Sequence, residues 1–126
     1  MVEPSQLIML SKSLQAWNSE NGQNHTNFKT VFIYEVEQLE GHLLPLQVAL
    51  RYSNYAVLDE FKTMVISIQE TDRTLEIKTG IAYNGVVAGC NCVDDPTPLN
   101  EQTEFCECLF KIDKQTAQTT IQLIEN

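Results

Sequence analysis

The chain has 126 residues and a composition ordinary for a folded protein, so we expect one domain over residues 1–126 with a single hydrophobic core. Its 17 Asp and Glu residues outnumber 8 Lys and Arg residues, which gives a net charge of −9. Such a charge disfavours nucleic acid and anionic membrane surfaces as partners, and it attracts a basic protein instead.

The first ten residues, Met1 to Leu10, show none of the features of a secretory signal. No basic region precedes an apolar run, and no small-residue cleavage motif follows. No apolar run in the sequence approaches the roughly 18–20 residues that a membrane-spanning helix needs. We therefore expect the protein to reside in the cytoplasm.

The first predicted element is an amphipathic helix near the N-terminus. Apolar residues recur there with helical spacing and form one stripe, which consists of Leu7, Leu10, Leu14 and Trp17. Pro4 suits the first turn of such a helix, and the pair Asn21-Gly22 suits its end. One face of this helix is expected to pack against the rest of the fold.

The segment from Phe28 to Leu58 fits two secondary structures. Residues 30–36 are rich in β-branched and aromatic side chains, as strands are. A helical stripe also runs through this region, formed by Phe28, Val31, Phe32, Val36 and Leu39. Residues 44–52 alternate like a strand, yet the apolar residues from Leu46 to Phe61 fit a helix about as well. Periodicity leaves both interpretations open, and we favour strands.

The pair Asn84-Gly85 is the strongest hairpin signal in the sequence, because both residue types tolerate the positive φ of a two-residue turn. A turn there places Tyr83 opposite Val86. The pairs that follow along the two strands are Ile81 with Ala88, Thr79 with Cys90, and Ile77 with Cys92. All of these side chains share one face of the predicted sheet.

Two further hairpins are expected on either side of this one. A four-residue turn at 70–73 sets Ile68 opposite Leu75, and another at 113–116 sets Ile112 opposite Ala117. The second turn also pairs Phe110 with Thr119, Cys108 with Ile121, and Cys106 with Leu123. Each pairing keeps apolar residues on one face, whereas a slip by one residue would expose them.

The predicted fold is therefore α+β. We expect a meander of about five or more antiparallel strands between Thr63 and Ile124, with the N-terminal amphipathic helix packed on its apolar face. Several apolar residues fall on the opposite face, namely Val65, Val87, Phe105, Leu109 and Ile124. Either the 28–58 segment covers that outer sheet face, or the face forms an interface such as that of a homodimer.

All four cysteines lie within 19 residues, as Cys90-Asn-Cys92 and Cys106-Glu-Cys108. If the two strands that carry them are neighbours, their sulfur atoms converge, and four thiolates bind zinc in closed sites. The C-x-C spacing on a flat strand presents both sulfurs to a metal poorly, however, and all four positions fall on the apolar face. We therefore favour buried core thiols without a cofactor, with a zinc site, or a disulfide or redox pair, as alternatives.

A polar segment with two prolines, residues 93–102, is predicted to form a surface loop between two strands. Four carboxylates lie in or beside this loop: Asp94, Asp95, Glu101 and Glu104. Clustered carboxylates can bind a divalent cation or share acid and base roles, but the EF-hand pattern is absent. We interpret these four residues as the contacts for a basic partner, since binding residues are often carried by loops.

The familiar catalytic motifs are absent from the sequence. The glycines form no phosphate-binding loop, there is no G-x-S-x-G elbow, and His25 and His42 belong to no metal or nucleophile motif. The sequence thus favours a non-enzymatic interaction module, of the inhibitor, immunity, chaperone or adaptor type, that binds a basic protein. Two alternatives remain, namely a four-cysteine zinc module and a small-molecule binder or unfamiliar enzyme with a pocket between helix and sheet.

Overall fold

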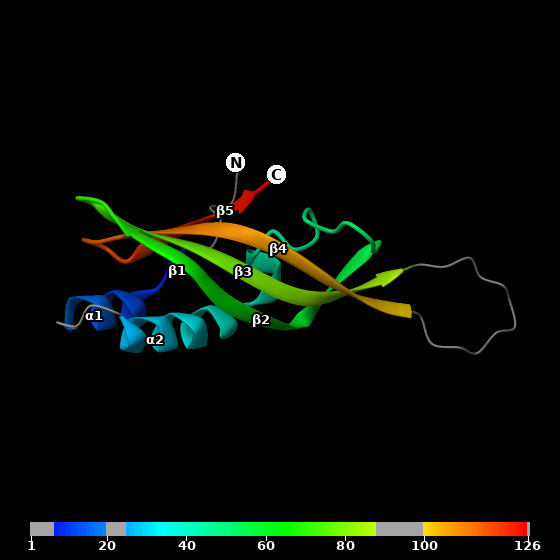
Figure 1. Cartoon of the computed structure of the whole chain (residues 1–126), viewed down its shortest axis with the longest axis horizontal. Helices are drawn as coiled ribbons and strands as arrows, with labels where there is room; N and C mark the ends of the chain where they lie inside the picture. The colour runs from blue at the N-terminus through cyan, green and yellow to red at the C-terminus, as the bar shows by residue number, and fades with distance from the viewer. Residues whose placement is uncertain (1–6, 20–24, 88–99, 126) are drawn as a thin grey trace, which may run out of the picture.

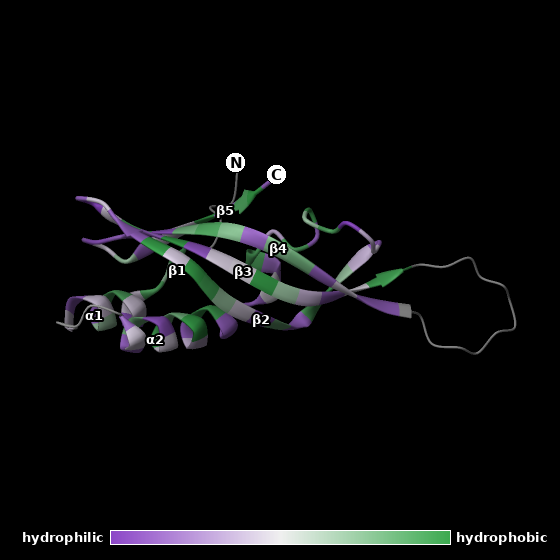
Figure 2. Cartoon of the chain, in the orientation of Figure 1, coloured by the Kyte–Doolittle hydropathy of each residue, from purple (hydrophilic) through white to green (hydrophobic). Residues whose placement is uncertain are grey.

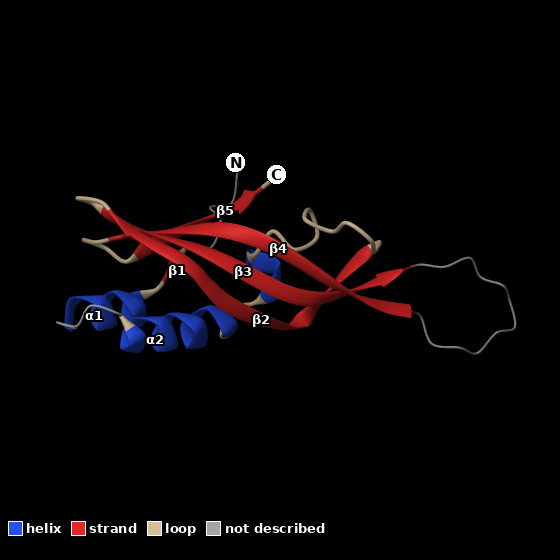
Figure 3. Ribbon diagram, viewed as in Figure 1, coloured by secondary structure: helices blue, strands red, loops and turns tan. Residues whose placement is uncertain are grey.

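The computed structural model describes residues 7–19, 25–87 and 100–125. The elements in chain order, coloured by type in Figure 3, are β1 (Ile8–Met9), α1 (Ser11–Ser19), α2 (Thr26–Glu37), the 3-10 helix η1 (Gly41–Leu43), β2 (Tyr55–Glu70), β3 (Thr74–Val87), β4 (Asn100–Asp113) and β5 (Gln118–Ile124). Within these ranges, no helix has the length and apolar character needed to cross a membrane.

The strands form one antiparallel sheet in the order β1-β5-β4-β3-β2. The long strands β2 to β5 are spatial neighbours in chain order and form a meander, as predicted, although it has four strands and begins at Tyr55. The short strand β1 brings the number of strands in the described sheet to five. The helices α1 and α2 lie side by side along one face of this curved sheet (Figure 1). The fold is therefore α+β, as the sequence predicts, with the N-terminal helices packed on one sheet face.

The core lies between the two helices and the inward face of the sheet. The inward residues of β3 and β4 are fully buried, and they include Leu75, Ile77, Ile81, Phe110 and Ile112. The ring of Phe32 in α2 meets that of Phe110 edge-to-face, with ring centroids 5.3 Å apart. Apolar and polar residues follow one another along the strands (Figure 2), as a sheet with one covered face requires.

The predicted N-terminal helix is α1, which begins later than the apolar stripe does. Leu10 and Leu14 are buried, and Trp17 packs against the core, as the stripe predicts. Leu7, in contrast, is 67% exposed. The two residues after it form β1, which pairs with β5 instead of continuing the helix.

The strand interpretation of the 28–58 segment is wrong for residues 28–54, and only residues 55–58 belong to a strand. Residues 26–37 form α2, and Phe28, Phe32 and Val36 on its inward stripe are all fully buried. Large apolar side chains four residues apart can all face a sheet from a helix, and this burial outweighs the β-propensity of the residues between them. Residues 44–54 contain no strand, and β2 begins only at Tyr55.

The prediction of a turn at Asn84-Gly85 is also wrong, because both residues lie inside β3. Gly85 pairs with Ala56 of β2 on one side and with Gln102 of β4 on the other. A Cβ atom at Gly85 would overlap the side chain of Ser53. The glycine therefore permits the close approach of a neighbouring segment, and it does not supply a turn conformation.

The strand partners predicted from that turn change accordingly. Of the residues assigned to the returning strand, Ala88, Cys90 and Cys92 lie outside the described residues. The observed partners come from β4, and they are Cys106 for Ile81, Cys108 for Thr79 and Phe110 for Ile77.

The two flanking hairpins exist, but each register differs from the prediction by two residues. Ile68 pairs with Ile77 and not Leu75, and Ile112 pairs with Thr119 and not Ala117. By the same offset, Phe110 pairs with Ile121 and Cys108 pairs with Leu123, whereas Cys106 has no β5 partner among the described residues. Because side chains alternate with a period of two, a shift of two residues leaves Ile68, Ile77 and Ile112 on their predicted face. Val65 is the exception, because the register irregularity between Val65 and Ser67 places it on the inward face and not on the predicted outer face.

Two glutamates of α2 satisfy backbone groups outside their own helix. The carboxylate of Glu35 accepts hydrogen bonds from the Ser13 N–H at 2.8 Å, the Lys12 N–H at 3.2 Å and the Ser13 hydroxyl at 2.7 Å. It thereby caps the first turn of α1, where N–H groups lack helical partners. Glu37 accepts a hydrogen bond of 2.7 Å from the N–H of Thr63 on β2.

Replacing Glu35 by Ala should lower the free energy of unfolding by about 1–2 kcal/mol, because the first turn of α1 loses its acceptor. Urea denaturation followed by circular dichroism measures this loss. Glu40→Ala is the matched control, since Glu40 is an exposed glutamate just beyond α2, and it should change stability by less than about 0.5 kcal/mol. Equal losses in both variants would contradict the capping role.

Candidate functional site

Unequal strand lengths leave part of one sheet edge open. β4 pairs with β3 along its whole length but with β5 only from Glu107 to Ile112. β5 ends at Ile124, opposite Glu107, so the described part of the chain supplies no second neighbour for residues 100–106. Backbone N–H and C=O groups that point away from β3 in this stretch are therefore available for pairing.

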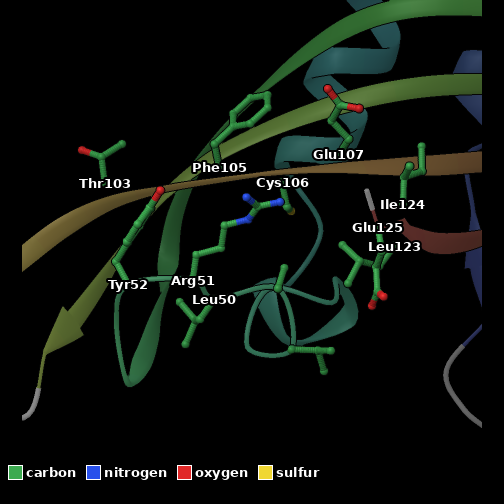
Figure 4. Close-up of a pocket in the computed structure, with 12 residues that line it drawn as sticks. Leu50, Arg51, Tyr52, Thr103, Phe105, Cys106, Glu107, Leu123, Ile124 and Glu125 are labelled. Atoms are coloured by element: carbon green, nitrogen blue, oxygen red, sulfur yellow. The ribbon is translucent and has the colours of Figure 1, made fainter.

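A hollow of about 580 Å³ lies beside this open edge. In Figure 4, β4 crosses above the hollow, residues 48–52 form its opposite wall, and residues 123–125 close one end. The lining residues are Val48, Ala49, Leu50, Arg51, Tyr52, Thr103, Phe105, Cys106, Glu107, Leu123, Ile124 and Glu125. We call this hollow, together with residues 100–107 of β4, the edge groove.

Glu104 fixes the wall of the edge groove to β4. It is only 1% exposed, and its carboxylate accepts hydrogen bonds from the Arg51 N–H at 2.9 Å, the Tyr52 N–H at 2.9 Å and the Ser53 hydroxyl at 2.8 Å. Burial by itself raises the pKa of Glu104, but these hydrogen bonds outweigh it and hold the pKa below its ordinary value. Glu104 is therefore an ionised, fully bonded anchor.

The same wall is held at two further points. The hydroxyl of Tyr83 donates a hydrogen bond of 2.7 Å to the carbonyl oxygen of Leu46. Burial raises the pKa of Tyr83, so the phenol remains a donor throughout the neutral range. Farther along, the side-chain amide of Gln47 donates a hydrogen bond to the Asn54 carbonyl oxygen and accepts one from the Ala56 N–H, both at 2.8 Å. Hydrogen bonds within the chain therefore hold this wall in place, and the hollow is preformed.

Carboxylates border the edge groove. On the outward face of β4, Glu101 is exposed and accepts a hydrogen bond of 3.1 Å from the Asn84 amide. Glu107 lies 3.6 Å from the ammonium group of Lys78. Glu125 is exposed beyond the end of β5. Arg51 is the only cationic residue among the described residues that line the hollow.

The opposite edge of the sheet, formed by β2, is built differently. Its register with β3 shifts twice, once between Val57 and Phe61 and once between Val65 and Ser67. These irregularities interrupt the row of edge groups, and Glu37 binds one of the N–H groups in that row. Such features hinder the addition of a further strand, so β4 presents the more regular free edge.

Only part of the predicted partner-binding set is placed by the structure. Glu101 and Glu104 lie within β4, and not in a loop as the sequence suggested. Glu101 is exposed beside the edge groove, whereas Glu104 is buried inside it. Asp94 and Asp95 lie outside the described residues.

Sequence reasoning missed the second wall of the edge groove, residues 48–52. Its strand-like alternation concealed an irregular segment. No local signal in the sequence identifies this wall. Its large apolar side chains are exposed, Val48 by 76% and Tyr52 by 67%, and such exposure becomes visible only once the fold is known.

Cys106 and Cys108 are free thiols buried on the inward face of β4, in agreement with the core interpretation. A hydrogen bond to Cys106, together with burial, raises the pKa of Cys108, which therefore stays a neutral thiol. The other two predicted zinc ligands, Cys90 and Cys92, lie outside the described residues. Across the described ranges, no group of three or more His, Cys, Asp or Glu side chains is arranged to hold a metal ion.

Neither histidine lines the edge groove. The ring of His25 stacks on that of Trp17, with centroids 4.1 Å apart and planes inclined by 14°. His42 Nδ1 lies 3.5 Å from a carboxylate oxygen of Glu40. Both contacts belong to the helical layer of the molecule.

The outer sheet face is not covered by any element in the described residues, since α1, α2 and the 44–54 segment all pack on the inward face. The expectation that the 28–58 segment covers it is therefore wrong. Val65 faces inward, where it pairs with Thr79 and packs on the core. Met64 and Phe105 meet above Gly80, where a Cβ atom would lie 3.0 Å and 2.8 Å from them. A homodimer through this face stays a prediction.

Comparison of the chain with protein-family models, with curated proteins and with solved structures finds no match. The geometry and charge of the edge groove are therefore the features that indicate a function.

Glu104→Gln should lower the free energy of unfolding by about 2 kcal/mol near neutral pH, because a neutral amide replaces a charged acceptor of three hydrogen bonds. The pKa of Glu104 in the folded state lies below its ordinary value of 4.5. Its contribution is therefore present above that value and is lost as the pH falls through the folded-state pKa. The stability difference between wild type and variant should shrink on acidification.

Denaturation at a series of pH values measures this difference. Glu101→Gln is the matched control on the same strand, because Glu101 is exposed. It should leave both the stability and its pH dependence close to those of the wild type. A Glu104→Gln difference that stays constant into acid would contradict the role of the ionised carboxylate.

Proposed function

We propose that this protein is an interaction module that binds a basic protein partner at the edge groove. The observation that carries the proposal is the open edge of β4, which lies beside a preformed hollow bordered by carboxylates. Edge backbone groups supply hydrogen bonds to a partner, and the hollow supplies room for its side chains. An inhibitor, immunity protein, chaperone or adaptor would use such a surface.

The distribution of charge along β4 supports a basic partner. Between Asn100 and Phe110 the sequence has three glutamates and no lysine or arginine. Glu104 is bonded inside the molecule and Glu107 is paired with Lys78, so Glu101 and Glu125 are the exposed carboxylates that a partner would meet. The net charge of −9 adds long-range attraction for a basic protein, and it opposes binding to nucleic acid or anionic membranes.

We also propose that the protein works in the cytoplasm. The described cysteines, Cys106 and Cys108, are both free thiols. A reducing compartment maintains thiols in this form.

A short synthetic peptide in which lysine and valine alternate should bind the protein at low salt, and added salt should weaken the binding strongly. A peptide with glutamate in place of each lysine should not bind, because the groove border is acidic. Fluorescence anisotropy of labelled peptides measures both affinities. Equal affinity for the two peptides would overturn the proposed basic partner.

The variant Glu101→Gln/Glu125→Gln localises the binding. It should weaken the lysine peptide about two- to fivefold for each exposed charge removed, as expected for surface ion pairs. The matched control is Asp72→Asn, an exposed acidic residue in the turn between β2 and β3. An equal effect of both variants would show that only the total charge matters.

A further inference from the structure

We propose that the partner segment binds as an added β-strand, antiparallel to β4, along the open edge formed by residues 100–106. This inference rests on the proposed function and specifies how the basic partner is held. The added strand would lie in the row that β5 occupies farther along the sheet, where β5 already pairs with residues 107–112 of β4.

The backbone geometry of β4 favours this mode of binding. β3 holds residues 100–106 in a regular antiparallel register, from Val87 opposite Asn100 to Ile81 opposite Cys106. A strand fixed on one side by such a ladder keeps its other edge extended and ready to pair. No described strand occupies that edge, and the hollow beside it gives an added chain room to enter.

The side chains around the groove specify an alternating partner sequence. Side chains of the added strand that point inward would meet Cys106 and Leu123 and the opposite wall at Leu50, so apolar residues fit there. Those that point outward would lie in the row of Glu101, Thr103 and Phe105, where Glu101 and the net charge of −9 favour lysine or arginine. The expected ligand is therefore an extended segment in which apolar and basic residues alternate.

The same charges disfavour a second copy of this chain as the occupant. Antiparallel pairing of two open edges, centred on Thr103, would set Glu101 of each copy opposite Phe105 of the other and would leave Glu101 without a basic partner. The net charge of −9 on each copy adds repulsion between them. An uncharged or acidic strand lacks the attraction that a basic strand would have, so the basic segment is the better complement.

Backbone N-methylation of the lysine–valine peptide tests this inference without altering the protein. N–H groups along a strand point alternately toward the neighbour and away from it. Methylation at the positions that face β4 should weaken binding about tenfold or more, whereas methylation at the positions between them should change it little. Loss of affinity should therefore follow a period of two along the peptide.

Amide hydrogen exchange of the protein, followed by NMR, provides the second measurement. Added peptide should protect alternate amides between Asn100 and Cys106 and should leave the β2 edge, which includes Thr63, unchanged. Protection of the β2 edge alone would overturn the inference. So would a dimeric free protein in which the open β4 amides are already protected, because that result assigns the edge to a second copy.

The two proposals fail in different ways. If the unmodified peptide binds with strong salt dependence but N-methylation shows no period of two, the basic partner stands and strand addition is wrong. If the unmodified peptide does not bind at all, the edge groove is not a site for basic segments and both proposals are wrong. Asp72→Asn, which leaves the groove intact, should reproduce the wild-type pattern in both measurements.

Discussion

The edge groove depends on one interaction, the hydrogen bonding of the buried Glu104 carboxylate to residues 51–53. A buried charge is costly unless donors surround it, and the Arg51 N–H, the Tyr52 N–H and the Ser53 hydroxyl meet that requirement. The constraint acts in both directions. Glu104 needs the irregular segment for its donors, and the segment needs Glu104 to stay beside β4. The hollow exists because the segment is held at this distance from the sheet edge.

The same chemistry recurs elsewhere in the molecule. Glu35 accepts hydrogen bonds from the first turn of α1, and Glu37 accepts one from the edge of β2. In all three places a glutamate side chain satisfies backbone N–H groups that have no partner in regular secondary structure. Part of the acidity of this protein is therefore structural. The remaining exposed carboxylates, such as Glu101 and Glu125, are those free to attract a partner.

Sequence patterns predicted the faces of the sheet better than its pairing. The period of two placed Ile77, Phe110 and Ile112 correctly on the inward face, because burial selects apolar residues at every second position. The exact register depends on how many residues each turn contains, and both hairpin turns shifted it by two. The turn prediction at Asn84-Gly85 failed for a different reason. Gly85 leaves room for the Ser53 side chain, which comes from a distant part of the chain, and it does not form a turn.

The site was less predictable than the fold. Composition pointed to carboxylates near β4, and Glu101 does lie at the groove. Nothing local distinguished it from Glu104, which is buried by a segment about 50 residues earlier in the chain. The α2 helix was missed because its β-branched residues resemble a strand, while the deciding feature was the sheet that its stripe covers. Contacts between segments that are distant in the sequence therefore decide which polar side chains are exposed and which are buried and hydrogen-bonded.

The stacking of Trp17 on His25 has a consequence for spectroscopy. Trp17 is the only tryptophan, so the intrinsic indole fluorescence of the protein comes from a single ring at the junction of α1 and α2. That emission reports whether the helical layer is assembled, because indole fluorescence depends on what surrounds the ring. Since Trp17 does not line the edge groove, the signal is a local optical probe of the helices. Events at the sheet edge can be followed separately from the integrity of the layer that supports it.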